Sequence, residues 1–154
     1  MILRGYEPGD LDAMHALDVA CFERPFRFTR RAMQRFAEAK KARVVIADID
    51  HTVAGFCILH IERAEYGRAA YIVTLDVAPD HRRKGIARAL MLQAELLAAE
   101  AMCTMMALHV FIGNTAAMGF YQSAGFIRSH RSPGFYGSSL DALVLHKTLV
   151  PAAA

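Results

Sequence analysis

The order of hydrophobic and polar positions divides the chain into segments of two periods, one typical of helices and one typical of strands. Apolar residues recur at helical spacing after Asp10 and after Thr29, and we expect these two residues to cap the first and second helices. A third helical pattern covers residues 86–102, and a short fourth pattern covers residues 114–123. The periodicity and the caps together predict four helices.

Strand-like segments lie between these helices. Their expected ranges are 2–4, 43–47, 53–61, 70–77, 105–111, 126–130 and 140–148. This order predicts an α/β (α+β) domain over residues 1–150, with a mostly antiparallel meander, then a strand–helix–strand unit, then a terminal hairpin-like pair. Residues 151–154 are expected to form a frayed tail.

The composition narrows the class of protein. Hydrophobic residues make up 55% of the 154 residues and charged residues 21%, which excludes a disordered chain. No apolar run reaches the roughly 20 residues that span a bilayer, and the first eight residues do not resemble a signal peptide. Cys21, Cys57 and Cys103 are widely spaced, so we expect reduced core thiols in a cytoplasmic protein. The histidines show no metal-binding spacing, and no metal site is expected.

A basic loop at residues 81–84 precedes Gly85 and the third predicted helix. A strand, a short basic turn with glycine and a helix together direct unpaired backbone N–H groups and the positive end of the helix dipole at one ligand. Gly85 allows a close approach of the backbone because it has no Cβ. The net charge is only +3 and the basic run is short, which favours a pyrophosphate over a nucleic acid. Neither a Walker loop nor a Rossmann fingerprint is present.

Two sequence blocks are similar to those of the GNAT superfamily of N-acetyltransferases. Residues 77–90 resemble its acetyl-CoA motif, (Q/R)xxGx(G/A), preceded by a strand that ends in V-x-P. Residues 114–126 resemble its second block, N-xx-A-xx-x-Y-xx-x-GF, in the right order and at the right separation. The resemblance implies a mostly antiparallel mixed sheet of about six to seven strands with about four helices, and splayed strands at the acetyl-CoA site.

In this superfamily the strand before the loop separates from its neighbour, and its backbone binds the pantetheine arm like an added strand. The loop amides then cradle the pyrophosphate. Asn114 is implied to lie along the pantetheine arm, although its side chain could serve only as a helix cap. The implied cofactor-binding residues are Leu75, Asp76, Val77, Arg82, Arg83, Lys84, Gly85, Ile86, Ala87, Arg88, Asn114 and Tyr121.

Tyr121 and His109 are the candidate catalytic residues. Tyr121 matches the tyrosine that lies near the thioester sulfur and protonates the leaving thiolate, unless it only packs a short helix. The chain most resembles the RimI-type N-terminal alanine acetyltransferases, which share a CF-x-x-P-(W/F) loop with residues 21–26. That group carries a glutamate where this chain has His109, so the general base could be His109, Asp76 or an ordered water.

The implied function is transfer of an acetyl group from acetyl-CoA to a primary amine. The expected acceptor is the α-amino group of a protein or peptide, with Tyr136 as a plausible wall of its site. A small-molecule amine is an alternative, because GNAT folds are reused for many acceptors. A CoA-binding module without catalysis and a nucleic-acid binder that uses residues 82–84 are competing classes. The chain could be a monomer or a homodimer.

Overall fold

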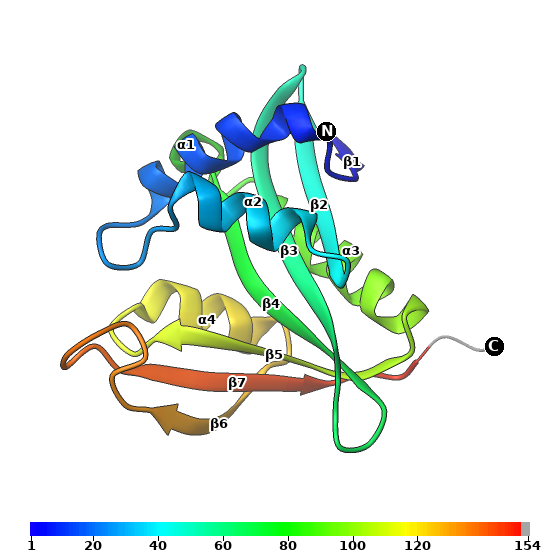
Figure 1. The fold of residues 1–154 in the computed structure, drawn as a ribbon, viewed down its shortest axis with the longest axis vertical. Coiled ribbons are helices and arrows are strands. Elements are labelled where there is room, and N and C mark those ends of the chain that lie inside the picture. Colours follow the sequence, from blue (N-terminus) through cyan, green and yellow to red (C-terminus); the bar gives the residue numbers. More distant parts are fainter. Residues whose placement is uncertain (152–154) are drawn as a thin grey trace.

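Residues 1–151, the part that this computed structural model describes, form a seven-stranded sheet with helices on both faces (Figure 1). The strands are β1 (Ile2–Arg4), β2 (Ala42–Ile49), β3 (Thr52–Arg63), β4 (Arg68–Val77), β5 (Cys103–Phe111), β6 (Ile127–Ser132) and β7 (Ala142–Thr148). The helices are α1 (Leu11–Cys21), α2 (Arg30–Glu38), α3 (Ile86–Glu100) and α4 (Thr115–Ser123), with 3-10 turns η1 (Pro8–Asp10) and η2 (Pro79–His81).

The strand order is β1-β2-β3-β4-β5-β7-β6, and all neighbours are antiparallel except β4 and β5. This confirms the predicted mixed, mostly antiparallel sheet. The expected strand ends differ by a few residues: β6 begins and ends later than predicted, and β7 begins at Ala142. Of the predicted tail, residues 152–154 lie outside the described part of the chain.

The sheet separates two hydrophobic cores. The larger core lies under α3 and α4 and includes Leu90 and Phe126. The second lies between the opposite face and helices α1 and α2, and it includes Met14 and Phe56. Figure 1 shows α1 and α2 crossing the first strands of the sheet, with α3 behind it. The two layers fix the sheet from both sides at the strands that form the site.

Both predicted N-terminal cap positions are confirmed, but only one of the two residues caps its helix through its side chain. The Thr29 hydroxyl accepts the backbone N–H of Ala32 at 3.0 Å, as expected of a cap. Asp10 precedes α1, but its side chain makes no cap hydrogen bond there. The Asp10 carboxylate instead accepts two hydrogen bonds from the Arg4 guanidinium, both at 2.8 Å. The paired charge is the stronger partner for a carboxylate, and it ties the start of α1 to strand β1.

Strands β4 and β5 pair only along part of their lengths, from their N-terminal ends. Their parallel register runs from Arg68 to Ile72 and stops there. At the end of this pairing, β4 also forms a bulge against β3. Ile58 of β3 pairs with Thr74, but the next residue, Leu59, pairs with Ile72. Val73 therefore has no partner residue on β3. A bulge bends a strand and strengthens its twist. Beyond Val73, β4 stays with β3 and leaves β5, which confirms the splayed strands that the resemblance implied.

We expect a Gly55→Ala substitution to destabilise the fold by about 1–3 kcal/mol, the usual cost of overpacking a core. A Cβ at Gly55 would lie 2.8 Å from the backbone carbonyl oxygen of Asp76 and 3.2 Å from Leu90 Cδ1. Gly119 is the matched control, since a Cβ there meets nothing within 4 Å, and Gly119→Ala in α4 should stabilise by about 0.5–1 kcal/mol. Denaturant titration measures both changes. Equal stability of Gly55→Ala and the parent chain would show that the β4 backbone shifts to make room for the added Cβ.

Candidate functional site

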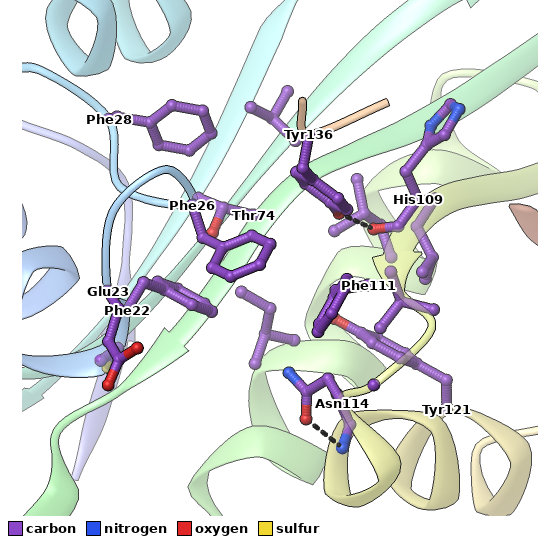
Figure 2. Close-up of a pocket in the computed structure, with 18 residues that line it drawn as sticks. Phe22, Glu23, Phe26, Phe28, Thr74, His109, Phe111, Asn114, Tyr121 and Tyr136 are labelled. Carbon is purple, nitrogen blue, oxygen red and sulfur yellow. Dashed lines mark hydrogen bonds between the residues drawn. The ribbon is translucent and has the colours of Figure 1, made fainter. Parts of the chain in front are cut away.

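A cavity of about 460 Å³ opens where β4 and β5 separate (Figure 2). Five parts of the chain line it: the end of α1 with the α1–α2 loop, β4, β5, the start of α4 with the turn before it, and the β6–β7 loop. The lining residues are Cys21, Phe22, Glu23, Phe26, Phe28, Ile72, Val73, Thr74, Leu75, Leu108, His109, Val110, Phe111, Gly113, Asn114, Ala117, Tyr121 and Tyr136. The cavity is therefore polar at a few positions and aromatic over much of its surface.

The basic loop turns into α3 through two residues in the left-handed region. Arg83 has a φ of 61° and Gly85 a φ of 79°, directly before α3 begins at Ile86. The Ile86 side chain is buried in the core, so this residue can offer a ligand only its backbone amide. The space beside the Gly85 Cα is open, because a Cβ there would meet nothing within 4 Å. Such a turn at a helix start fits a pyrophosphate.

Four basic side chains surround this turn. Arg82, Arg83, Lys84 and Arg88 are all exposed, and Ala87 is partly buried against the core. The loop residues predicted from the sequence thus lie together at the N-terminus of α3. Their charges add to the positive end of the helix dipole.

The three β4 residues expected to bind the cofactor lie in different surroundings. Leu75 lines the cavity. The Asp76 side chain is only 1% exposed and does not line it, because it faces α1 rather than the splay. The carbonyl oxygen of Val77 accepts the Cys21 thiol at 3.2 Å and the Arg82 Nε at 3.4 Å. Only the backbone of β4 up to Leu75 therefore offers free groups beside the cavity.

Asn114 and Tyr121 lie on the same side of the cavity, on α4 and the turn before it (Figure 2). The side-chain amide oxygen of Asn114 accepts the N–H of Ala117 at 3.1 Å, so Asn114 is the helix cap that the sequence allowed. Tyr121 is 9% exposed and packs edge-on against Phe126, with ring centroids 5.7 Å apart. Burial raises the pKa of the Tyr121 phenol, which keeps its proton at neutral pH.

His109 lies on β5 at the other side of the cavity and is held by two aromatic residues. Its Nδ1 is 2.8 Å from the Tyr71 hydroxyl, and its ring stacks on Phe135 with centroids 3.9 Å apart. Burial, and then the charge of His130, lower the pKa of His109, so the imidazole is neutral near neutral pH. Figure 2 shows the ring pointing away from Tyr121 and Asn114. His109 is thus an oriented, unprotonated group at the edge of the cavity.

An aromatic cluster closes the cavity between the α1–α2 loop and the β6–β7 loop. The Phe26 ring lies 4.9 Å from Phe111 and 5.0 Å from Tyr136, measured between centroids. The Tyr136 hydroxyl donates to the backbone carbonyl of His109 at 3.2 Å, which ties the β6–β7 loop to β5. Burial raises the pKa of Tyr136 to about 12, so the phenol stays a donor. Tyr136 therefore lines the cavity, and its role as a wall of the acceptor site stays a prediction.

Sequence analysis missed three residues that support the site: Tyr71, Thr74 and Asp18. Tyr71 and His109 come from neighbouring strands 38 residues apart, so no local motif joins them. Thr74 lines the cavity, and its hydroxyl donates to Asp76. Asp18 lies on the buried side of α1. A carboxylate among the apolar positions of an amphipathic helix is unusual, and this position in the sequence could have identified it.

Residues 1–151 offer neither a metal cluster nor a membrane-spanning helix. Within that range, no group of three or more His, Cys, Asp or Glu side chains is arranged to hold a metal ion. Over the same described residues, no helix has both the length and the apolar character that crossing a bilayer requires.

Several known proteins are similar to this chain. N-alpha-acetyltransferase 30 of Xenopus laevis is 36% identical over 78 residues, which span 51% of this chain and 29% of that protein. The structure of Naa20 from Chaetomium thermophilum with a bisubstrate analogue has a TM-score of 0.78 and 26% identity, and the match covers 97% of this chain and 87% of the other. The ribosomal-protein-S18-alanine N-acetyltransferase from Escherichia coli has a TM-score of 0.85, with coverage of 99% and 96%. At 19% identity this last likeness is one of fold.

The model of the acetyltransferase (GNAT) family matches residues 11–126. This stretch contains the basic loop, the splayed strands, and the turn and helix that carry Asn114 and Tyr121. Acetyl-CoA is the acetyl donor of the family, and the open turn at Gly85 with its free amides fits the pyrophosphate of that molecule. The chain belongs to the GNAT family of acetyltransferases.

Proposed function

We propose that this chain transfers the acetyl group of acetyl-CoA to a primary amine, most specifically the α-amino group of a protein or peptide. The observation that carries the proposal is the cavity at the splay of β4 and β5, with the basic turn at the start of α3 and an aromatic cluster beside His109. The similarity to proteins described as N-alpha-acetyltransferases supports the α-amino acceptor. The matched segment spans less than a third of that relative, so the acceptor stands as a proposal.

The cofactor would supply the acetyl group as an activated thioester, and the chain supplies binding and orientation. Backbone amides from Arg83 to Arg88 would hold the pyrophosphate, with the four basic side chains of the loop around it. The free edge of β4 up to Leu75 would hold the pantetheine arm, across the cavity from Asn114. Hydrogen bonds from backbone groups to a flexible arm fix its direction, and this positioning accounts for a large part of the rate acceleration in bimolecular reactions.

Tyr121 is the proposed general acid. It lines the cavity from α4, and its raised pKa keeps the phenolic proton available at neutral pH. A thiolate leaving group needs a proton, and a phenol within hydrogen-bond reach can provide it. The packing of Tyr121 against Phe126 fixes the ring and therefore the direction of the hydroxyl.

His109 is the proposed general base. Its Nδ1 is engaged by Tyr71, so Nε2 is the nitrogen that can accept a proton, in the tautomer where Nδ1–H donates to the Tyr71 oxygen. The ring points away from Tyr121, and a single water would carry the proton from the acceptor amine. Asp76 is the weaker alternative, because its carboxyl is buried against α1 and does not line the cavity.

The three thiols support the expected cytoplasmic location. Cys21, Cys57 and Cys103 are all free in the structure. Burial raises the pKa of Cys57 and of Cys103, which keeps both as unreactive thiols. A chain with free core thiols and no disulfide among its described residues suits a reducing compartment.

An acceptor screen that follows release of the CoA thiol tests the proposed function. We expect turnover with peptides that begin with Ala, Ser or Met, and none with the same peptides blocked at the N-terminus. Polyamines and free amino acids test the small-molecule alternative. Turnover with polyamines and with no peptide would contradict the α-amino acceptor and favour a small-molecule amine. If the chain binds the cofactor tightly but neither the parent chain nor Tyr121→Phe shows turnover with any acceptor, a CoA-binding module without catalysis is favoured.

A further inference from the structure

Two carboxyl groups are buried together between α1 and β4. Asp18 is 0% exposed and Asp76 is 1% exposed. Each has one oxygen with a clear partner: Asp18 Oδ2 accepts the backbone N–H of Phe28 at 2.8 Å, and Asp76 Oδ1 accepts the Thr74 hydroxyl at 2.5 Å. The other oxygen of each, Asp18 Oδ1 and Asp76 Oδ2, is buried and has no partner among the described residues.

The two carboxyl groups contact each other, and a proton between them would satisfy both remaining oxygens. Two carboxylates that share a buried site cannot both ionise without a large cost in free energy. Burial, and then the contact with Asp18, raise the pKa of Asp76 well above its ordinary range, while the Thr74 hydroxyl and the charge of Arg82 oppose this. The other titratable groups around Asp76 are Cys21 of α1, Cys57 of β3 and Tyr121 of α4.

We propose that Asp18 and Asp76 share one proton, and that this pair positions the acceptor side of the cavity. Through Phe28, Asp18 fixes the α1–α2 loop, and four residues of that loop line the cavity. Through Thr74, Asp76 fixes the β4 wall just beyond the bulge. Neither carboxyl lines the cavity, so both are positioning residues. Their role in positioning an acceptor rests on the proposed function, whereas the shared proton does not.

The pair makes the stability of the fold depend on pH above the ordinary Asp range. Above the ordinary Asp pKa of about 3.9, the unfolded chain holds no proton on Asp76, while the folded chain still holds one. Stability therefore falls as pH rises, because the folded state binds more protons. Once the pH passes the raised pKa of Asp76, two like charges face each other inside the protein. The α1–α2 loop, held through Phe28, is the segment that this repulsion would loosen.

Asp18→Asn is the discriminating variant. Its amide oxygen can still accept the Phe28 N–H, and its amide nitrogen can donate to Asp76 Oδ2 without a shared proton. The parent chain should show the infrared carbonyl band of a protonated carboxylic acid at neutral pH, and Asp18→Asn should lose it. The fall of the melting temperature as the pH rises above about 4 should also become shallower in Asp18→Asn. Asp76→Asn offers the mirror arrangement and serves as a second variant if the first fails to fold.

Asp12→Asn is the matched control, because Asp12 lies on the same helix with an 82% exposed side chain. It should keep both the infrared band and the parent pH dependence. An absent band in the parent chain, or an unchanged band and slope in Asp18→Asn, would overturn the shared proton.

Kinetics separate the shared proton from its role in positioning. Asp18→Ala leaves Phe28 without its partner and should raise the KM of an acceptor peptide about tenfold, with the KM of acetyl-CoA unchanged. Asp18→Asn should change neither value by more than about twofold. Equal KM values in Asp18→Ala and the parent chain would overturn the positioning role. If Asp18→Asn loses the infrared band but the parent chain acetylates no acceptor, the shared proton stands and only the proposed function is contradicted.

Discussion

A Gly85→Glu variant is expected to lose measurable acetyl-CoA binding. Gly85 adopts a φ of 79° at the start of α3, so any side chain carries a strain of about 1–2 kcal/mol there. A carboxylate at this point also places negative charge where the helix dipole and the loop favour a phosphate. Since a Cβ at Gly85 meets no atom of the protein within 4 Å, the added side chain would obstruct the ligand and leave the fold intact. Titration calorimetry with acetyl-CoA measures the loss.

Gly85→Asn is the control for the backbone strain. Asparagine tolerates the left-handed region and carries no charge, so this variant should retain weaker but measurable binding. Circular dichroism melting should show both variants folded. Micromolar binding in Gly85→Glu would contradict the assignment of the loop to the pyrophosphate.

A His109→Gln variant is expected to lower kcat by a hundredfold or more, roughly the range that general bases provide, with the KM of acetyl-CoA unchanged. Glutamine keeps a planar polar group beside Phe135 but cannot accept a proton at neutral pH. In the parent chain, kcat should fall on the acid side, as the imidazole becomes protonated below its lowered pKa. The variant should lack that acid limb. A pH series of steady-state rates tests both expectations.

Tyr71→Phe is the companion variant for His109. It removes the hydroxyl that orients Nδ1, so it should lower kcat by less than His109→Gln and leave cofactor binding intact. If turnover and its pH profile are unchanged in His109→Gln, then His109 is structural, and water or Asp76 becomes the base to test.

The sequence predicted well the features that local stretches of chain determine. The helix periods, the Thr29 cap and the Asn114 cap each depend on residues within one turn, and all are confirmed. The basic loop was also accessible, since its charge, its glycine and the following helix are contiguous. Asp10 is the N-cap residue of α1, as predicted, but its carboxylate binds Arg4, which lies on a strand that the helix pattern does not include.

The sequence alone did not predict contacts between residues that lie far apart along the chain. The Tyr71–His109 hydrogen bond depends on how far β4 and β5 run together before they part. The Asp18–Asp76 contact depends on α1 crossing β4, and the sequence alone places neither carboxyl beside the other. The resemblance named Asp76 as a possible base, but only the structure shows that its side chain faces α1.

Where the β4–β5 pairing ends, next to the unmatched Val73, this protein has a free strand edge in the interior of its sheet. Exposed edges usually invite another β-strand, and proteins shield them to avoid aggregation. Here the edge is short and is enclosed by the aromatic cluster on one side and by α4 on the other. The bulge therefore turns backbone groups of β4 toward the inside of the fold, where a bound molecule rather than a neighbouring protein can pair with them.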